Sequence, residues 1–347
     1  MSFANPSRFR TGLRWFLMIA LFCLAAVFFW GAYVLESANN REVAVNTEAA
    51  PTTGTFQPAG DVRLFVQSVG NESDPAVVFI HGTGSWSETW RPVMNAVAAK
   101  GYRAVALDIP PFGYSDRPAS EDYSRQAQGH RILSVLAALN LKNPILVGHS
   151  FGARATLTAL LEKPDAAKAV VFVDPAPGFA AEPGQPAATG AMPGASILGV
   201  RLVREMLIAA TVGNPNFTRK LLSGFVYEPE KIPEATVAIY QRPMNQKGNT
   251  PAVANWLYQF IGKDDPTLMS DVETFAARSK LPIELIWGDK DTVTPLWQGE
   301  RLRELWNGSQ LQVLDGVGHI PQIESEARFI EMLLSSLSRV GQPTRLN

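Results

Sequence analysis

Residues 145–152, Ile-Leu-Val-Gly-His-Ser-Phe-Gly, are the stretch that decides the fold. A short apolar run, Pro144–Val147, leads into Gly148-x-Ser150-x-Gly152, and small, helix-favouring residues follow. This order predicts a nucleophile elbow, a strand-to-helix turn so tight that only small residues fit on either side of its central serine. Such a turn would hold Ser150 Oγ at the N-terminus of a helix, where the dipole and the free N–H groups favour negative charge.

Apolar runs bounded by turn residues recur on both sides of this elbow, and helical stretches lie between them. Strands rich in Val, Ile and Leu that alternate with helices predict an α/β fold, with a mostly parallel central sheet covered by helices on both faces. The expected strands are Val62–Val69, Ala76–Ile80, Arg103–Asp108, Pro144–Val147, Ala169–Asp174, Ile283–Trp287 and Leu311–Leu314, and the expected helices are Ser87–Ala99, Ser124–Leu139, Ala153–Glu162, Pro295–Trp306 and Ser325–Val340.

The alternation stops between about Gly178 and Lys280. A stretch dense in Gly, Pro and Ala (178–196) comes first, and amphipathic helical pieces follow. We therefore expect an inserted helical lid at 178–280, between core segments 61–177 and 281–347. The alternative, ordinary core helices in a long crossover, is disfavoured because most crossovers are short.

An uncharged apolar run near the N-terminus, Trp15–Leu35, has the length of roughly 20 residues that a membrane-spanning helix needs. Arginines precede it (Arg8, Arg10 and Arg14), which predicts a cytoplasmic N-terminus (residues 1–14) and a catalytic domain on the other side of the membrane. We expect a single-pass anchor at 15–35 and a solvated linker at 36–60. A cleaved signal peptide is the alternative, although its apolar core usually has only about 7–15 residues.

Composition excludes several classes of function. The 31 Lys and Arg residues nearly balance the 32 Asp and Glu residues, and no basic run with interleaved aromatics suggests nucleic-acid binding. The single cysteine, Cys23, lies in the apolar run, so the folded part has no disulfide and no cysteine metal site. We expect no cofactor and no metal.

A serine nucleophile needs a base within hydrogen-bond reach, and the chain has four histidines. His319 follows the last expected strand, at the sheet edge where ligand chemistry in open α/β folds belongs, so we expect it to be the base. His149 lies inside the elbow and is expected to pack away from the nucleophile. His130 is expected at the surface, and His81 opens a glycine-rich loop after a core strand.

The acid that orients the base should also follow a strand. Asp291, just beyond Ile283–Trp287, is the preferred candidate, and it would stabilise the imidazolium of the base. Asp174 ends the preceding core strand and is the main rival. Asp289 is expected to be a turn residue and Asp108 part of the loop architecture.

An oxyanion hole requires N–H donors aimed at the developing charge. One should be the backbone N–H of Phe151, directly after the nucleophile. The second should come from the loop that begins at His81, where we favour the N–H of Thr83, with Gly84 next. An ordinary glycine turn is the alternative for this loop.

Five motifs in this order resemble the α/β-hydrolase superfamily, in its lidded branch with epoxide hydrolases, haloalkane dehalogenases, carbon–carbon bond hydrolases and monoacylglycerol lipases. The resemblance implies that Ser150, Asp291 and His319 form a catalytic triad. A serine in place of the aspartate nucleophile argues against epoxide hydrolase and dehalogenase chemistry. The motifs are His81-Gly82, Asp108-x-Pro-x-x-Gly113-x-Ser115-Asp116, Gly148-His-Ser150-x-Gly152, Trp287-Gly-x-x-Asp291 and Gly318-His319-x-Pro321.

These observations predict a serine hydrolase that cleaves a lipophilic carboxylic ester through an acyl-enzyme. The apolar faces of Ile197–Val212 and of Trp256, Leu257 and Phe260, close to an expected anchor, favour a small lipophilic acyl substrate. Carbon–carbon bond hydrolysis of a vinylogous diketone uses the same triad and is the nearest alternative. Amidase activity comes next, followed by a non-catalytic binding module on the same fold.

Overall fold

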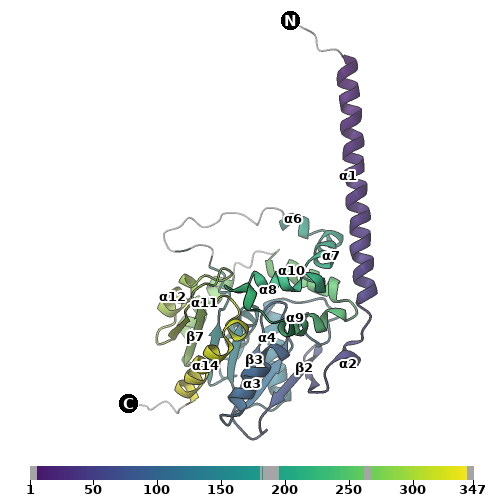
Figure 1. Cartoon of the computed structure of the whole chain (residues 1–347). Helices are drawn as coiled ribbons and strands as arrows, with labels where there is room; N and C mark the ends of the chain where they lie inside the picture. The colour runs from purple at the N-terminus through teal and green to yellow at the C-terminus, as the bar shows by residue number, and fades with distance from the viewer. Residues whose placement is uncertain (1–5, 180–181, 183–194, 262–266, 342–347) are drawn as a thin grey trace.

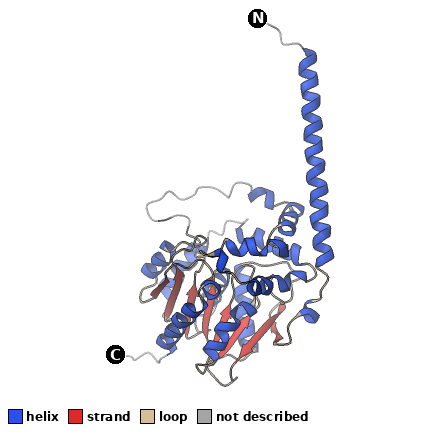
Figure 2. Cartoon of the chain, in the orientation of Figure 1, coloured by secondary structure: helices blue, strands red, loops and turns tan. Residues whose placement is uncertain are grey.

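The computed structural model describes residues 6–179, 182, 195–261 and 267–341, and its centre is an eight-stranded sheet. The strand order is β1-β2-β4-β3-β5-β6-β7-β8, in which β1 and β2 run antiparallel to their neighbours and the other pairs are parallel (Figures 1 and 2). The expected mostly parallel sheet is therefore confirmed. The strands are β1 (Gly54–Ala59), β2 (Val62–Val69), β3 (Ala76–Ile80), β4 (Arg103–Leu107), β5 (Ile145–His149), β6 (Ala169–Val173), β7 (Ile283–Gly288) and β8 (Gln310–Leu314).

Helices cover both faces of the sheet. Every residue of β3, β5 and β6 is buried, as the continuous apolar runs require. One face packs against α3 (Arg91–Ala98) and α14 (Glu326–Gly341), and the other packs against α4 (Arg125–Ala138) and α5 (Phe151–Glu162). The short helices α12 (Trp297–Leu305) and α13 (Pro321–Glu324) lie before and after β8.

The prediction of a solvated linker at residues 36–60 is wrong in two respects. Helix α1 (Pro6–Arg41) continues into it, and its last part contains strand β1. Phe56 pairs with Phe65 in the β1–β2 hairpin, and Gly60 forms the turn with a positive φ of 74°. Gly, Pro and Ala have low strand propensity and make up half of the six residues of β1, so this strand depends strongly on its partner.

The segment between β6 and β7 is helical where the structure describes it. Part of the Gly/Pro/Ala-rich stretch (180–181 and 183–194) and residues 262–266 lie outside the described residues. The helices pack above the carboxyl ends of the parallel strands, and α7 lies next to α1 (Figure 1). They are α6 (Ala195–Leu198), α7 (Arg201–Ala210), α8 (Thr218–Ser223), α9 (Glu234–Gln241), α10 (Asn249–Ile261) and α11 (Thr267–Arg278), with short 3₁₀ turns at Pro215–Phe217, Pro229–Lys231 and Arg242–Asn245.

Helix α1 projects away from the rest of the chain (Figure 1). Its part from Trp15 to Arg41 is long and apolar enough to cross a membrane, with a mean hydropathy of 2.3 in its most apolar window, a test that a signal sequence near the N-terminus also passes. The segment after α1 is tied to the insertion. Glu42 is buried and its carboxylate accepts hydrogen bonds from the Thr250 backbone N–H and hydroxyl at the start of α10, while Ala44 forms a bridge with Gln246.

Candidate active site

Ser150 lies at the sharp turn between β5 and α5, and its backbone is strained. Its φ of 49° and ψ of −116° are a conformation that residues with a side chain rarely adopt. A Cβ at Gly148 would come within 2.8 Å of Thr156 Oγ1, and one at Gly152 would collide with the His81 carbonyl oxygen. The two glycines are therefore required by space, as the elbow motif predicts.

His319 and Asp291 meet Ser150 at the carboxyl edge of the sheet. His319 Nε2 lies 2.8 Å from Ser150 Oγ, and His319 Nδ1 lies 2.7 Å from Asp291 Oδ2. An ionised carboxylate can only accept, so Nδ1 carries the proton and Nε2 is free to accept the proton of Ser150. The structure thus brings together the three residues expected to form the triad, from three separate loops.

The Asp291 carboxylate has four donors around it. Oδ1 accepts from the backbone N–H groups of Val293 and Thr294, at 2.7 and 2.9 Å, and Oδ2 accepts from the Thr294 hydroxyl at 2.7 Å as well as from His319. Burial alone would raise the pKa of Asp291, but the hydrogen bonds and charge of His319 and the Thr294 donors outweigh it, and the pKa lies below its ordinary value. Asp291 is therefore ionised. The sequence analysis missed the role of Thr294 as a donor to Asp291. Aspartate side chains often accept hydrogen bonds from backbone N–H groups a few residues further along, in turns.

The rival acid, Asp174, lies close by but does not bond to the histidine. Its Oδ1 accepts from the Gly288 N–H at 2.9 Å, and its Oδ2 has no donor among the residues that the structure describes. Complete burial and the neighbouring Asp291 charge raise the pKa of Asp174 well above its usual value, which favours the protonated carboxyl. Asp174, Asp291 and His319 present atoms within 4.8 Å of one another, as a metal site would, but His319 Nδ1 already bonds to Asp291.

The other two aspartates hold loops, as expected. Asp289 Oδ1 accepts from the Gly316 N–H at 2.6 Å and so joins the loops after β7 and β8. The buried Asp108 accepts from the Ser87 and Tyr114 N–H groups.

None of the three remaining histidines is hydrogen-bonded to Ser150. His149 is buried, and its Nε2 lies 2.8 Å from the His319 carbonyl oxygen, to which it donates; burial lowers its pKa to about 3. His81 Nε2 accepts from the Ile109 N–H at 2.8 Å, and burial lowers its pKa to about 4. His130 is exposed and lies near Glu162. His149 thus supports the loop that carries His319 rather than serving as a base.

The two groups expected to form an oxyanion hole lie beside Ser150. Phe151 is the first residue of α5, so its N–H precedes the helical hydrogen-bond ladder. Within the described part of the chain, neither this N–H nor that of Thr83 donates to a protein acceptor. Thr83 and Gly84 border the same cavity as Ser150 and His319. These N–H groups are thus available to a ligand.

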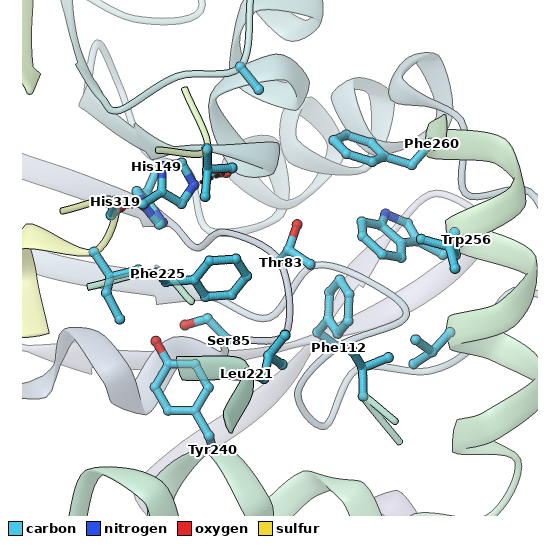
Figure 3. Close-up of a pocket in the computed structure, with 18 of the residues that line it drawn as sticks. Thr83, Ser85, Phe112, His149, Leu221, Phe225, Tyr240, Trp256, Phe260 and His319 are labelled. Atoms are coloured by element: carbon cyan, nitrogen blue, oxygen red, sulfur yellow. Dashed lines mark hydrogen bonds between the residues drawn. The ribbon is translucent and has the colours of Figure 1, made fainter. Parts of the chain in front are cut away.

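A cavity of about 580 Å³ extends from Ser150 beneath the helical insertion. This volume lies within the range of ~300–1,000 Å³ common for small-molecule sites. Figure 3 shows Phe112, Trp256 and Phe260 on one side, His319 on the opposite side, and Thr83 between them. Trp256 stacks on Phe260 with ring centroids 5.0 Å apart, so this wall of the cavity is aromatic.

The insertion also holds the histidine loop. The His319 N–H donates to the Phe225 carbonyl oxygen at 2.7 Å, and the Glu324 carboxylate accepts from the N–H groups of Gly318, Tyr227 and Glu228. These contacts join residues 225–228, after α8, to the loop after β8. No pattern in the sequence predicts them, because they depend on how the insertion docks.

The comparisons with known proteins agree with this architecture. The family model for the alpha/beta hydrolase fold matches residues 75–326, and the chain belongs to this family. A 2-hydroxy-6-oxononadienedioate/2-hydroxy-6-oxononatrienedioate hydrolase of Burkholderia vietnamiensis is 25% identical over 86% of this chain and 99% of its own length. Lipase 3 of a Moraxella species is 24% identical over 77% of this chain and 78% of its own length.

Among solved structures, a bacterial membrane phospholipase A covers 97% of this chain and 100% of its own chain, with a TM-score of 0.66 and 21% identity. At this identity the likeness shows the shared fold. Hydrolases, including lipases and carbon–carbon bond hydrolases, are therefore what this chain is similar to, and it has the fold of a hydrolase.

Proposed function

We propose that the chain is a membrane-anchored serine hydrolase that cleaves lipophilic carboxylic esters through an acyl-enzyme. The observation that carries the proposal is the hydrogen-bonded array of Ser150, His319 and Asp291 at the end of an apolar cavity. A binding module would need none of the strain stored at Ser150.

In the acylation step, His319 Nε2 takes the proton of Ser150 as Oγ attacks the acyl carbonyl carbon. The tetrahedral oxyanion accepts hydrogen bonds from the N–H groups of Phe151 and Thr83. Asp291 stabilises the imidazolium meanwhile, because it is ionised and holds Nδ1–H at 2.7 Å. The carbon–oxygen bond then breaks, and the imidazolium passes its proton to the leaving alcohol.

In the deacylation step, His319 takes a proton from water, and the resulting hydroxide attacks the acyl carbon. The second tetrahedral intermediate uses the same two N–H groups. Its collapse releases the carboxylic acid and returns the proton to Ser150 Oγ, so the enzyme is restored.

The apolar lining of the cavity favours an ester substrate over a dicarboxylate, the type of substrate in the name of the Burkholderia relative. The described lining is mostly apolar, and burying an ionised carboxylate against such walls is costly. Its charged member, Arg154, lies over the Phe260 ring and donates to the Ala176 carbonyl oxygen. Carbon–carbon bond hydrolysis remains the second candidate, since the Burkholderia hydrolase named above matches most of the chain.

The packing of α1 supports an uncleaved anchor. Val34 and Ala38 are 9% and 1% exposed because they lie against α7, and Glu42 bonds to Thr250. Removal of α1 by a signal peptidase would uncover this face. Together with the three arginines that precede the apolar run, this supports a single-pass protein whose catalytic domain lies on the non-cytoplasmic side.

An active-site probe tests the serine chemistry. Full-length protein in detergent should react covalently with a fluorophosphonate, and Ser150→Ala should not. The absence of labelling in folded wild-type protein would overturn the proposal.

A panel of p-nitrophenyl esters of increasing chain length then tests the substrate class. We expect kcat/KM to rise from acetate to medium chains. Preference for acetate would refute the lipophilic site, and turnover of a 2-hydroxy-6-oxo-dienoate without ester turnover would favour the second candidate.

A further inference from the structure

Helix α1 contacts the insertion along one short part of its length. Gly31 lies directly against the end of the Met206 side chain of α7, so closely that a Cβ at Gly31 would require this methionine to shift. One and two turns further along, Val34 and Ala38 pack against Ala209. Helix α7 is therefore held beside residues 31–38 of α1.

This part of α1 coincides with one end of its apolar run. From Trp15 to Trp30 the described side chains are exposed or half-buried, and the last strongly exposed aromatic residue of the run is Tyr33, at 69%. At about 1.5 Å per residue, Trp15–Tyr33 spans about 28 Å, close to the ~30 Å hydrocarbon core of a bilayer. Trp30 and Tyr33 are the aromatic residues expected at the membrane–water boundary. Helix α7 thus lies at this boundary if α1 spans the membrane.

The insertion exposes apolar side chains at the same place. Ile197, Val200 and Leu202 of the α6–α7 segment are 55%, 53% and 54% exposed, and Leu207 of α7 is 42% exposed. Four exposed aliphatic side chains on one short segment are unusual on a surface that faces only water. This segment adjoins the exposed apolar surface of α1, beside which α7 is drawn in Figure 1.

Helix α7 is also a wall of the cavity. Leu207 and Ile208 line it together with Thr211 and Val212, which follow the helix. Leu207 is therefore both accessible to solvent and part of the cavity lining. One wall of the cavity is thus formed by the same segment that carries the exposed apolar side chains.

We propose that the apolar face formed by Ile197, Val200, Leu202 and Leu207 docks on the lipid bilayer, so that the cavity of Ser150 receives its substrate from the membrane. The inference rests on the proposed anchor and deepens the proposed function, because it makes the substrate a membrane-resident acyl lipid rather than a dissolved ester. Arg201, at the start of α7, is paired with Glu205 and Glu121, so the face depends on apolar contact and not on anionic lipid.

Site-directed fluorescence tests the docking without using catalysis. In a Cys23→Ser background, Leu202→Cys is labelled with an environment-sensitive dye in full-length protein reconstituted into phosphatidylcholine vesicles. The control is Ser73→Cys, which lies in the exposed turn before β3, at the opposite edge of the sheet from Ser150. Brominated lipid should quench the dye at position 202 and leave position 73 unaffected, with iodide quenching in the reverse order. Equal quenching by iodide at both positions would overturn the proposal.

A kinetic comparison tests the consequence for substrate access. Val200→Asn combined with Leu202→Gln should lower hydrolysis of a vesicle-embedded ester about tenfold, because two aliphatic contacts with lipid are lost. Hydrolysis of a soluble short ester in detergent should be unchanged. The matched control is Val313→Asn, which removes another exposed aliphatic residue (41%), from β8. An equal effect of both changes on the vesicle substrate would contradict the docking.

The two experiments separate this inference from the proposed function. Dye quenching by lipid without ester hydrolysis would leave the docking intact and refute the ester hydrolase. Ester hydrolysis without lipid contact at position 202 would do the opposite.

Discussion

Replacing Asp291 by asparagine should disable the enzyme through the tautomer of His319. In the structure Asp291 Oδ1 accepts two backbone N–H groups, from Val293 and Thr294. An asparagine must place its carbonyl oxygen there, since its NH₂ group would otherwise face two donors. The NH₂ group then lies against His319 Nδ1, which must become an acceptor. Nε2 would carry the proton and could no longer accept one from Ser150.

The expected loss in kcat is about 10⁴-fold, the effect of the equivalent change in a serine protease triad, or about 5 kcal/mol of transition-state stabilisation. The assay is steady-state hydrolysis of a p-nitrophenyl ester by full-length protein, with fluorophosphonate labelling as an independent measure of Ser150 reactivity. The thermal unfolding midpoint establishes that the variant is folded.

Asp174→Asn is the matched control. Because burial and the Asp291 charge raise the pKa of Asp174 and so favour its neutral carboxyl, an amide of the same shape should replace it, with its oxygen accepting from the Gly288 N–H. We expect less than about a tenfold change in kcat, since the neutral amide resembles the protonated carboxyl. If Asp174→Asn were the more damaging change, the assignment of Asp291 as the acid would be refuted.

Three further outcomes are expected. Glu42→Ala should lower the thermal unfolding midpoint by several degrees, because the Thr250 N–H loses its buried acceptor at a cost of about 1–3 kcal/mol. Glu42→Gln should keep most of the wild-type midpoint, and equal midpoints for the two variants would contradict the role of the contact. Acid should destabilise the fold, because the pKa values of His81 and His149 are about 4 and 3 in the folded protein against about 6.5 in the unfolded chain. Stability that is present above pH 6.5 is therefore lost as the pH falls, and the loss for His81 is on the order of 3 kcal/mol. Unfolding measured against pH should show a shallower loss in His81→Asn, and an unchanged slope would count against it. Val253→Trp should fill part of the cavity and shift the ester preference to shorter chains with little change for acetate; an unshifted chain-length profile would place the acyl chain elsewhere.

Local sequence was sufficient for the features that depend on neighbours in the chain. The elbow was predictable because Gly148 and Gly152 leave room that no other residue leaves. The buried strands were predictable because sheets covered on both faces need continuous apolar runs. Strand β1 was missed because Gly, Pro and Ala make up half of its six residues, and pairing with β2 makes this segment a strand.

The sequence by itself therefore determined the class of fold, the helical character of the insertion and the residues that could act as nucleophile, base and acid. The sequence favoured Asp291 over Asp174 without excluding Asp174, since both follow core strands, and tertiary structure separated them by the hydrogen-bond partners that surround each carboxyl. It also decided that α1 packs on α7 beside the cavity. The physical reason is the same in both cases. Hydrogen-bond partners and packing neighbours far apart in the chain are set by how the elements dock, and no local periodicity records that arrangement.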